Sequence, residues 1–190
     1  MPLKENMKAP SFNLKDIYGR QIDLENYKTK RFLLGFFRHA GCPFCNLRVH
    51  TLQKLYNELK TKNFEMIFFF ESKEQVILRS TFHQEVSPIP IISDPEKKYY
   101  AVYGLEPSTT KAVISHVTSF AQTVVKANAA KVPVHMMADN ESFSTMPAEF
   151  LIDTGLVIRK ALYSERLNTR IDVDDIRTFA LTGAINSESR

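Results

Sequence analysis

The sequence predicts an α/β domain of three layers, with helices on both faces of a central sheet. The first observation is a strand–helix–strand order over residues 31–70, where two apolar runs of strand length enclose a segment of helical periodicity. The second is composition: 190 residues with 44% hydrophobic side chains, 14 Phe and 7 Tyr supply a large interior and exclude a disordered chain. We expect residues 1–190 to form one domain with an insertion.

The N-terminal part predicts a β-hairpin that precedes the first core strand. Residues 10–27 show two short apolar–polar alternations on either side of a turn at Gly19. Residues 31–37 (RFLLGFF) are a compact apolar run that leads directly into HAGCPFC. The two cysteines of the chain therefore follow a buried strand.

A helix and a second strand come next. Apolar residues recur at helical spacing up to about Lys62, at Cys45, Val49, Leu52, Tyr56 and Leu59. Residues 64–70 (FEMIFFF) are a second buried strand, and the crossover through the helix favours parallel pairing with the first.

The α/β order continues through residues 73–104. Residues 73–84 predict a helix, Pro88 and Pro90 interrupt it, and residues 91–93 predict a short strand. Asp94 fits the cap of a further helix over residues 95–103.

Residues 106–145 are expected to be a helical insertion. Ser108 or Thr109 fits an N-cap, and apolar residues then recur at Val113, Val117, Phe120 and Val124. We expect this apolar face to pack on the domain, as amphipathic helices usually do. The alternative is a surface that recruits a protein partner.

The C-terminal part predicts an antiparallel hairpin and a final helix. Residues 149–153 and 156–163 are strands around the turn at Thr154-Gly155. The helix begins near Asp172 or Asp174 and ends at Gly183.

Charge and hydropathy narrow the classes of partner. The 25 basic and 21 acidic side chains leave a formal charge of +4, but the two signs are mixed and no basic run occurs, so nucleic-acid binding is not indicated. No apolar stretch is long enough to span a membrane, and no secretory signal is visible, so we expect a cytoplasmic protein.

The C-P-F-C motif is the most informative feature of the sequence. Cys42 stands where a helix begins, and unpaired backbone N–H groups together with the helix dipole favour its thiolate. We therefore expect Cys42 to be the more acidic and more exposed thiol, and thus the nucleophile. Cys45 begins the apolar stripe and lies within range to resolve an adduct at Cys42. Two alternatives are half of a zinc site completed by histidines, and a pair of inert core thiols, although no second metal-binding motif accompanies the cysteines.

Two charged neighbours are candidate supporting residues. His39 stands three residues before Cys42, where it could stabilise a thiolate or shuttle a proton, although a loop histidine is more often solvated. Arg38 would add positive charge near the nucleophile if it turned toward the site, but it could equally face solvent.

Four segments carry a family resemblance: APSFNLKDIYGRQIDL, GFFRHAGCPFCNLRVHTLQ, ISDPEKKYYAVYGL and MPAEFLIDTGLVIRKALYS. They resemble the thioredoxin-fold superfamily, and within it the peroxiredoxin-like branch of the alkyl hydroperoxide reductase/thiol-specific antioxidant family. The resemblance implies a thioredoxin-like α/β/α sandwich with Cys42 at the first turn of the helix after the first core strand. It also implies a cis-proline opposite the cysteines, a position that Met146-Pro147 matches, where the backbone of residue 146 would pair with a disulfide substrate.

The sequence departs from typical peroxiredoxins at three positions. Those proteins carry Pro and Thr or Ser seven and three residues before the nucleophile, whereas Gly35 and His39 stand here. They also carry an arginine just before the strand that corresponds to residues 149–153, and Pro147 replaces it here. Arg38 could take the role of that arginine.

These observations predict a thiol-dependent oxidoreductase without a cofactor or a metal. A hydroperoxide is the substrate that the resemblance favours, and a protein disulfide is the substrate that the C-x-x-C and the proline favour. Either reaction needs an external thiol reductant, such as a thioredoxin or glutathione system. A non-enzymatic thioredoxin-fold binding module is the contrasting hypothesis.

Overall fold

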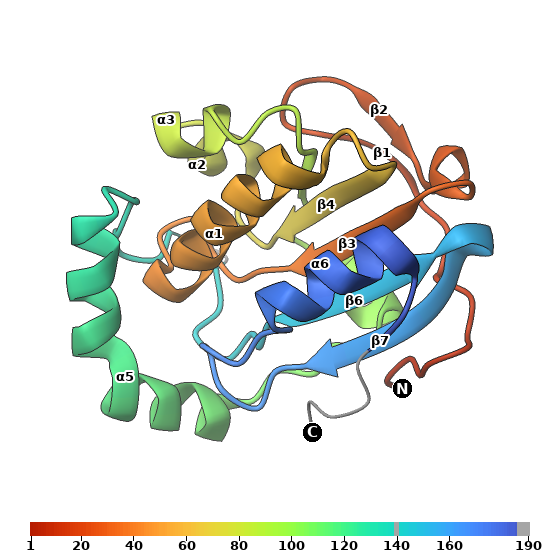
Figure 1. The fold of residues 1–190 in the computed structure, drawn as a ribbon. Coiled ribbons are helices and arrows are strands. Elements are labelled where there is room, and N and C mark those ends of the chain that lie inside the picture. The colour runs from red at the N-terminus through yellow and green to blue at the C-terminus, as the bar shows by residue number, and fades with distance from the viewer. Residues whose placement is uncertain (139–140, 186–190) are drawn as a thin grey trace.

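A five-stranded mixed sheet forms the centre of the molecule in the computed structural model, which describes residues 1–138 and 141–185 (Figure 1). The strand order is β5-β4-β3-β6-β7, where β3 pairs parallel with β4 and antiparallel with β6. The strands are β3 (Arg31–Phe36), β4 (Phe64–Phe70), β5 (Ile91–Ser93), β6 (Ala148–Asp153) and β7 (Val157–Tyr163). The predicted parallel unit and the antiparallel hairpin are both confirmed.

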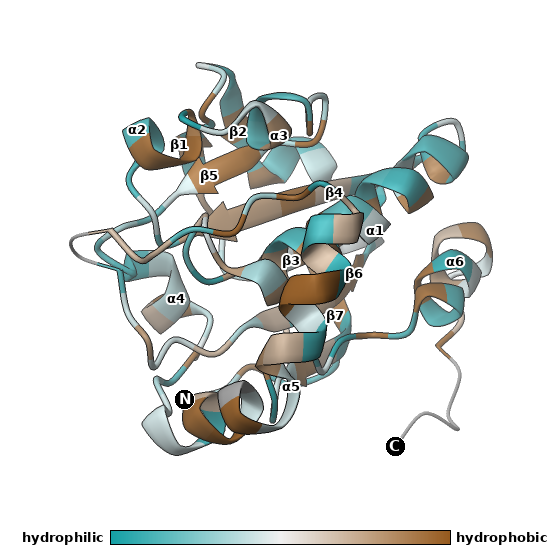
Figure 2. Cartoon of the chain, turned by 90° about the vertical axis from the view of Figure 1, so that its left-hand side faces the viewer, coloured by the Kyte–Doolittle hydropathy of each residue, from teal (hydrophilic) through white to brown (hydrophobic). Residues whose placement is uncertain are grey.

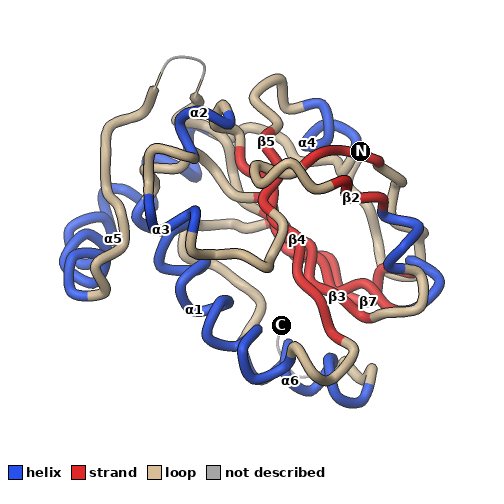
Figure 3. The backbone as a smooth tube through the Cα atoms, turned by 90° about the horizontal axis from the view of Figure 1, so that it is seen from above, coloured by secondary structure: helices blue, strands red, loops and turns tan. Residues whose placement is uncertain are grey.

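Helices cover both faces of this sheet, because alternate side chains of each strand point to opposite sides. Leu33, Phe68 and Leu151 face α1 (Pro43–Leu59) and α6 (Val173–Thr182). The other face, with Phe36, Phe69 and Phe150 among its residues, packs against α4 (Lys98–Val102) and the N-terminal segment. Figure 3 shows α1 and α6 on one side of the strands and α4 on the other. The three-layer prediction is confirmed.

The predicted N-terminal hairpin consists of β1 (Asn13–Lys15) and β2 (Gln21–Asp23), followed by the 3-10 helix η1 (Leu24–Tyr27). Gly19 turns the chain with a positive φ of 80°. The Asp16 carboxylate accepts the backbone N–H groups of Tyr18 and Arg20 at 3.0 and 2.9 Å, which satisfies the polar groups of the turn.

Two predicted helices are shorter than expected. In place of one helix over residues 73–84 there are α2 (Glu74–Ile77) and α3 (Thr81–Gln84), because Ser80 between them is extended. Helix α4 begins only at Lys98, because Lys97 adopts a left-handed conformation with φ 57°. Lys97 rather than Asp94 is the N-cap residue, but the Asp94 carboxylate accepts the backbone N–H groups of Lys98 and Tyr99 in the first turn.

Helix α5 (Thr109–Ala129) stands at one end of the sheet beside the start of α1 (Figure 1). Ser108 caps it, as predicted. The predicted packing of its apolar stripe is wrong for Val113 and Val117, which are 45% and 82% exposed, whereas Phe120 of the same stripe contacts the Phe44 ring. The buried residues of the helix are small: Ala112, Ser115, Thr123 and Ala127. Figure 2 shows apolar and polar residues along the same helix. Among the described residues, no helix has the length and hydropathy of a membrane span.

Candidate functional site

Both cysteines lie at the N-terminus of α1, where the chain leaves β3. Cys42 is the N-cap residue, Pro43 occupies the first turn, and Cys45 follows within that turn. Both thiols are reduced and completely buried, so the prediction that Cys42 is the more exposed thiol is wrong. The loop after α5, which covers the start of α1, accounts for this burial, since its residues line a cavity with Cys42.

The two thiols differ in acidity in the predicted direction. Burial raises the pKa of Cys42, but hydrogen bonds from the thiol and backbone N–H of Cys45 and the charges of Arg38 and Arg170 outweigh it, and the pKa falls to about 6. Burial raises the pKa of Cys45 well above its ordinary value, and the adjacent Cys42 raises it further. At neutral pH Cys42 is therefore a thiolate beside a protonated second thiol.

Arg38 faces the site, which decides between its two predicted orientations. Its Nη1 lies 3.8 Å from Cys42 Sγ, and its backbone N–H donates to Cys45 Sγ at 3.4 Å. The guanidinium is fixed by the carbonyl of Phe143, which accepts a hydrogen bond from Nη2 at 2.8 Å, and by the Phe143 ring, whose centroid lies 5.6 Å away. One buried arginine therefore contacts both sulfurs.

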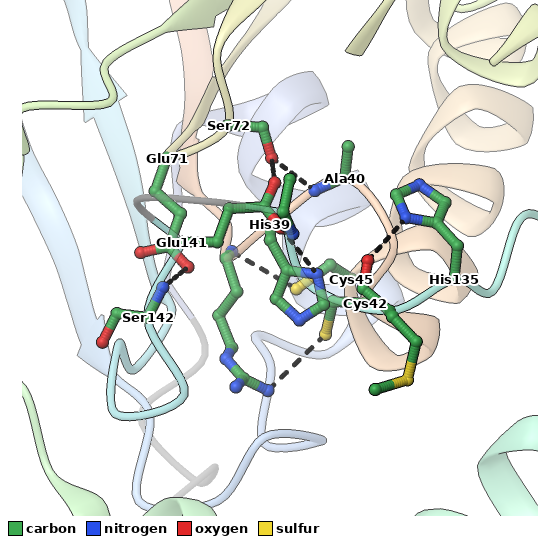
Figure 4. Close-up of polar contacts among 12 residues, drawn as sticks. His39, Ala40, Cys42, Cys45, Glu71, Ser72, His135, Glu141 and Ser142 are labelled. Atoms are coloured by element: carbon green, nitrogen blue, oxygen red, sulfur yellow. Dashed lines mark hydrogen bonds and ion pairs between the residues drawn. The ribbon is translucent and has the colours of Figure 1, made fainter. Parts of the chain in front are cut away.

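His39 is buried rather than solvated. Its Nδ1 lies 3.7 Å from Glu141 Oε2, within ion-pair range (Figure 4). The Glu141 carboxylate accepts hydrogen bonds from Ser72 Oγ and from the Ala138 backbone N–H. No sequence pattern pointed to this carboxylate, because it comes from the insertion, about a hundred residues further along the chain.

A cavity of about 410 Å³ opens on Cys42 and is mostly apolar. One side of the cavity is formed by the segment from the end of β3 to the start of α1, with Arg38, His39, Gly41 and Pro43. The remaining lining residues all belong to residues 106–145: Phe120, Val134, His135, Met136, Met137 and Phe143. The predicted insertion thus builds the far wall of the candidate active site, a role that its sequence did not reveal.

The insertion is fastened to the sheet by a second buried glutamate. Glu71, directly after β4, accepts hydrogen bonds from the Ser142 backbone N–H at 3.1 Å and from Thr145 Oγ1 at 2.5 Å. Lys97 forms an ion pair with the same carboxylate at 3.1 Å. These contacts hold the segment whose Phe143 carbonyl fixes Arg38, so they support the position of the guanidinium.

The expectation for Met146-Pro147 is wrong. This peptide bond is trans, and the cis bond found among residues 1–138 and 141–185 is Ser87-Pro88. Neither Met146 nor Pro147 lines the cavity at Cys42. The Pro147 carbonyl accepts the Ser164 backbone N–H at 3.0 Å, which extends the pairing of β6 and β7.

A buried charge cluster on the α1 side of β6 was also missed. Glu149 accepts two hydrogen bonds from Arg48, both at 2.8 Å, and its Oε1 lies 3.5 Å from Arg170 Nε. The signal available in the sequence was a glutamate directly before the apolar residues 150–152. Among the described residues, no group of three His, Cys, Asp or Glu side chains is arranged to hold a metal ion.

Replacing Arg38 by methionine is expected to raise the pKa of Cys42 by about 1 to 3, because an opposite charge at this distance is lost while the side-chain volume is kept. The rate of iodoacetamide alkylation against pH measures this change, and its midpoint should move up from about 6. Exposed Arg79, replaced by methionine, is the matched control. An unchanged midpoint in the Arg38 variant would mean that the guanidinium does not stabilise the thiolate.

Known proteins share this fold. Solved structures that match include a thiol peroxidase from Chromobacterium violaceum, with a TM-score of 0.65, 14% identity and coverage of 96% of this chain and 89% of that one. The peroxidoxin BcpB from Mycobacterium tuberculosis matches with a TM-score of 0.64, 14% identity and coverage of 97% and 99%.

Sequence relatives belong to two groups. The thiol-disulfide oxidoreductase ResA of Bacillus anthracis is 27% identical over 106 residues, which are 56% of this chain and 61% of the relative. The peroxiredoxin Bcp of Escherichia coli K12 is 26% identical over 104 residues, or 55% and 66%. The chain thus matches about three fifths of the length of ResA. The AhpC/TSA family model matches residues 6–161, and the chain is a thioredoxin-fold, peroxiredoxin-like member of the AhpC/TSA family.

Proposed function

We propose that this chain is a thiol-dependent oxidoreductase that reduces hydroperoxides, with Cys42 as the nucleophile and Cys45 as the resolving thiol. The observation that carries the proposal is the state of Cys42: its pKa falls to about 6 although it is completely buried, and it opens on a cavity beside Arg38. A buried thiolate that a small molecule can reach through a cavity suits a small oxidant.

The proposed reaction has three steps. The Cys42 thiolate attacks the terminal oxygen of ROOH, the O–O bond breaks, and with one proton the products are ROH and Cys42 sulfenic acid. The Cys45 thiol then attacks the Cys42 sulfur, which forms the Cys42–Cys45 disulfide and releases water. An external thiol reductant, for which thioredoxin and glutathione systems are the candidates, then reduces the Cys42–Cys45 disulfide to two thiols. The reductant is itself oxidised to a disulfide.

The burial of the cysteines favours a peroxide over a protein disulfide. The sulfur of a protein disulfide would have to reach Cys42 Sγ, but Cys42 is completely buried and borders only on the cavity. The trans Met146-Pro147 bond also removes the backbone platform expected for an extended disulfide substrate. Disulfide reduction stays the second candidate because relatives named thiol-disulfide oxidoreductase match this chain.

Replacing Cys45 by serine separates the two substrates, because attack at Cys42 survives and the chain holds no third cysteine to resolve the product. With hydrogen peroxide, the variant should accumulate sulfenic acid at Cys42, detected by mass spectrometry of the dimedone adduct. With reduced protein and insulin as disulfide substrate, a stable mixed disulfide would instead favour the second candidate.

A binding module without thiol chemistry predicts a different pattern. The variant lacking both cysteines would then keep its partner, and the Cys45→Ser protein would form neither trapped species. Either trapped species at Cys42 would exclude the module as the sole function.

A further inference from the structure

A histidine shares the cavity with Cys42 and lies within ion-pair range of a buried carboxylate, and the three reaction steps above use neither group. His39 lines the cavity together with Cys42 and is only 6% exposed. The His39 carbonyl accepts the Cys42 backbone N–H at 3.0 Å, so the two residues belong to one tight turn. Figure 4 shows the His39 ring beside the cysteines, on the side of Glu141.

Glu141 is held so that its charge faces this ring. Its side chain is 2% exposed, and its Oε2 lies 3.7 Å from His39 Nδ1. The Ala138 backbone N–H donates to the same carboxylate at 2.6 Å, and Ser72 Oγ, which accepts the Ala40 backbone N–H at 2.7 Å, donates to its other oxygen. A fixed and desolvated carboxylate stabilises a protonated imidazole next to it.

The peroxide reaction has a use for such a proton. When the O–O bond breaks, the electron pair stays on the oxygen of the leaving alkoxide, which is a poor leaving group unless it is protonated as the bond breaks. His39 lines the same cavity, and an imidazole is able to give up a proton near neutral pH.

We propose that His39 is the general acid of the peroxide step and that Glu141, supplied by the insertion, is the positioning residue that keeps the ring oriented and protonated; this rests on the function proposed above. As the Cys42 thiolate attacks the terminal oxygen, the His39 imidazolium gives its proton to the leaving RO⁻. The products are Cys42 sulfenic acid, ROH and neutral His39, which regains its proton from solvent.

The test uses two oxidants that differ in their need for a proton. tert-Butyl hydroperoxide releases a strongly basic alkoxide, whereas peracetic acid releases acetate, which leaves without protonation. For His39→Gln, stopped-flow oxidation of the reduced protein should be about 100-fold slower with tert-butyl hydroperoxide and less than about 3-fold slower with peracetic acid. Glu141→Gln should show the same selective loss, smaller in size.

Alkylation of Cys42, the comparison of the two oxidants and the rate of the wild-type protein distinguish the general-acid role from the peroxidase function. Alkylation of Cys42 by iodoacetamide should be unchanged in His39→Gln, since no leaving group needs its proton, and His50→Gln on α1 serves as the matched control. Equal losses with both oxidants, or no loss, would overturn the general-acid role while the peroxidase function stands. If the wild-type protein reacted with neither oxidant faster than free cysteine does, the peroxidase function would fall and the general-acid role with it.

Discussion

The Cys42→Ser protein is expected to lose all thiol chemistry, although Cys45 remains one helical turn away. Cys45 is completely buried, its pKa is well above the ordinary value, and its sulfur accepts the Arg38 backbone N–H. It is therefore a protonated thiol at neutral pH and a poor nucleophile. Peroxide consumption, dimedone labelling and mixed-disulfide formation should all fall to the level of the variant lacking both cysteines.

The wild-type protein gives the complementary measurement. Because the thiolate is the reactive form, alkylation at Cys42 should rise with pH, reach half of its maximum near pH 6 and level off above it. A peptide map should show Cys42 labelled before Cys45. Turnover retained by Cys42→Ser, or faster labelling of Cys45, would contradict the assigned roles and reopen a structural role for the pair.

Local patterns were sufficient to predict the path of the chain to the nucleophile. The apolar run of β3, the helical spacing after Cys45 and the run of β4 each reflect burial of one element, which sequence periodicity records directly. The position of Cys42 at the start of α1 follows from these elements, and so does one cause of its low pKa, the hydrogen bonds from Cys45 in the first turn. The chemistry of the motif was therefore predictable from the sequence near it.

The surroundings of the motif were not predictable in this way, because they depend on contacts between distant segments. Arg38 faces the sulfurs because the Phe143 carbonyl fixes it, and no periodicity links those two residues. The burial of Cys42 likewise depends on the segment after α5, which covers the start of α1. Pro147 matched a family position by sequence alone, but its peptide bond with Met146 is trans, so its geometry differs from the expectation.

The orientation of α5 illustrates the same limit. The sequence predicted that its valines would be buried, but Val113 and Val117 are exposed, and the buried residues of the helix are small ones such as Ala112 and Ala127. Periodicity identifies an amphipathic helix but does not tell which stripe meets the neighbour when both contain apolar residues.

Glu149→Ala is expected to be strongly destabilising, although Glu149 lies outside the redox motif. Its carboxylate is fully buried and lies beside Arg170. It accepts two hydrogen bonds from Arg48 and a third from the Ile171 backbone N–H. Removing the carboxylate leaves the buried guanidinium groups of Arg48 and Arg170 without their counter-charge. These groups lie where α1 and the segment before α6 pack against β6.

Breaking a buried pair of this kind costs about 3–5 kcal/mol of unfolding free energy, since the desolvated charges are no longer compensated. Urea unfolding of the reduced protein measures the change, and Glu149→Gln, which keeps an acceptor, should lose less. The matched surface control is Glu58→Ala, because Glu58 pairs with Arg177 while its side chain is 55% exposed. Solvent screens such a pair, so its loss should cost less than about 1 kcal/mol. Equal effects at the two glutamates would show that burial does not govern the Arg48–Glu149–Arg170 cluster, and that the segment before α6 is held to the sheet by its apolar contacts alone.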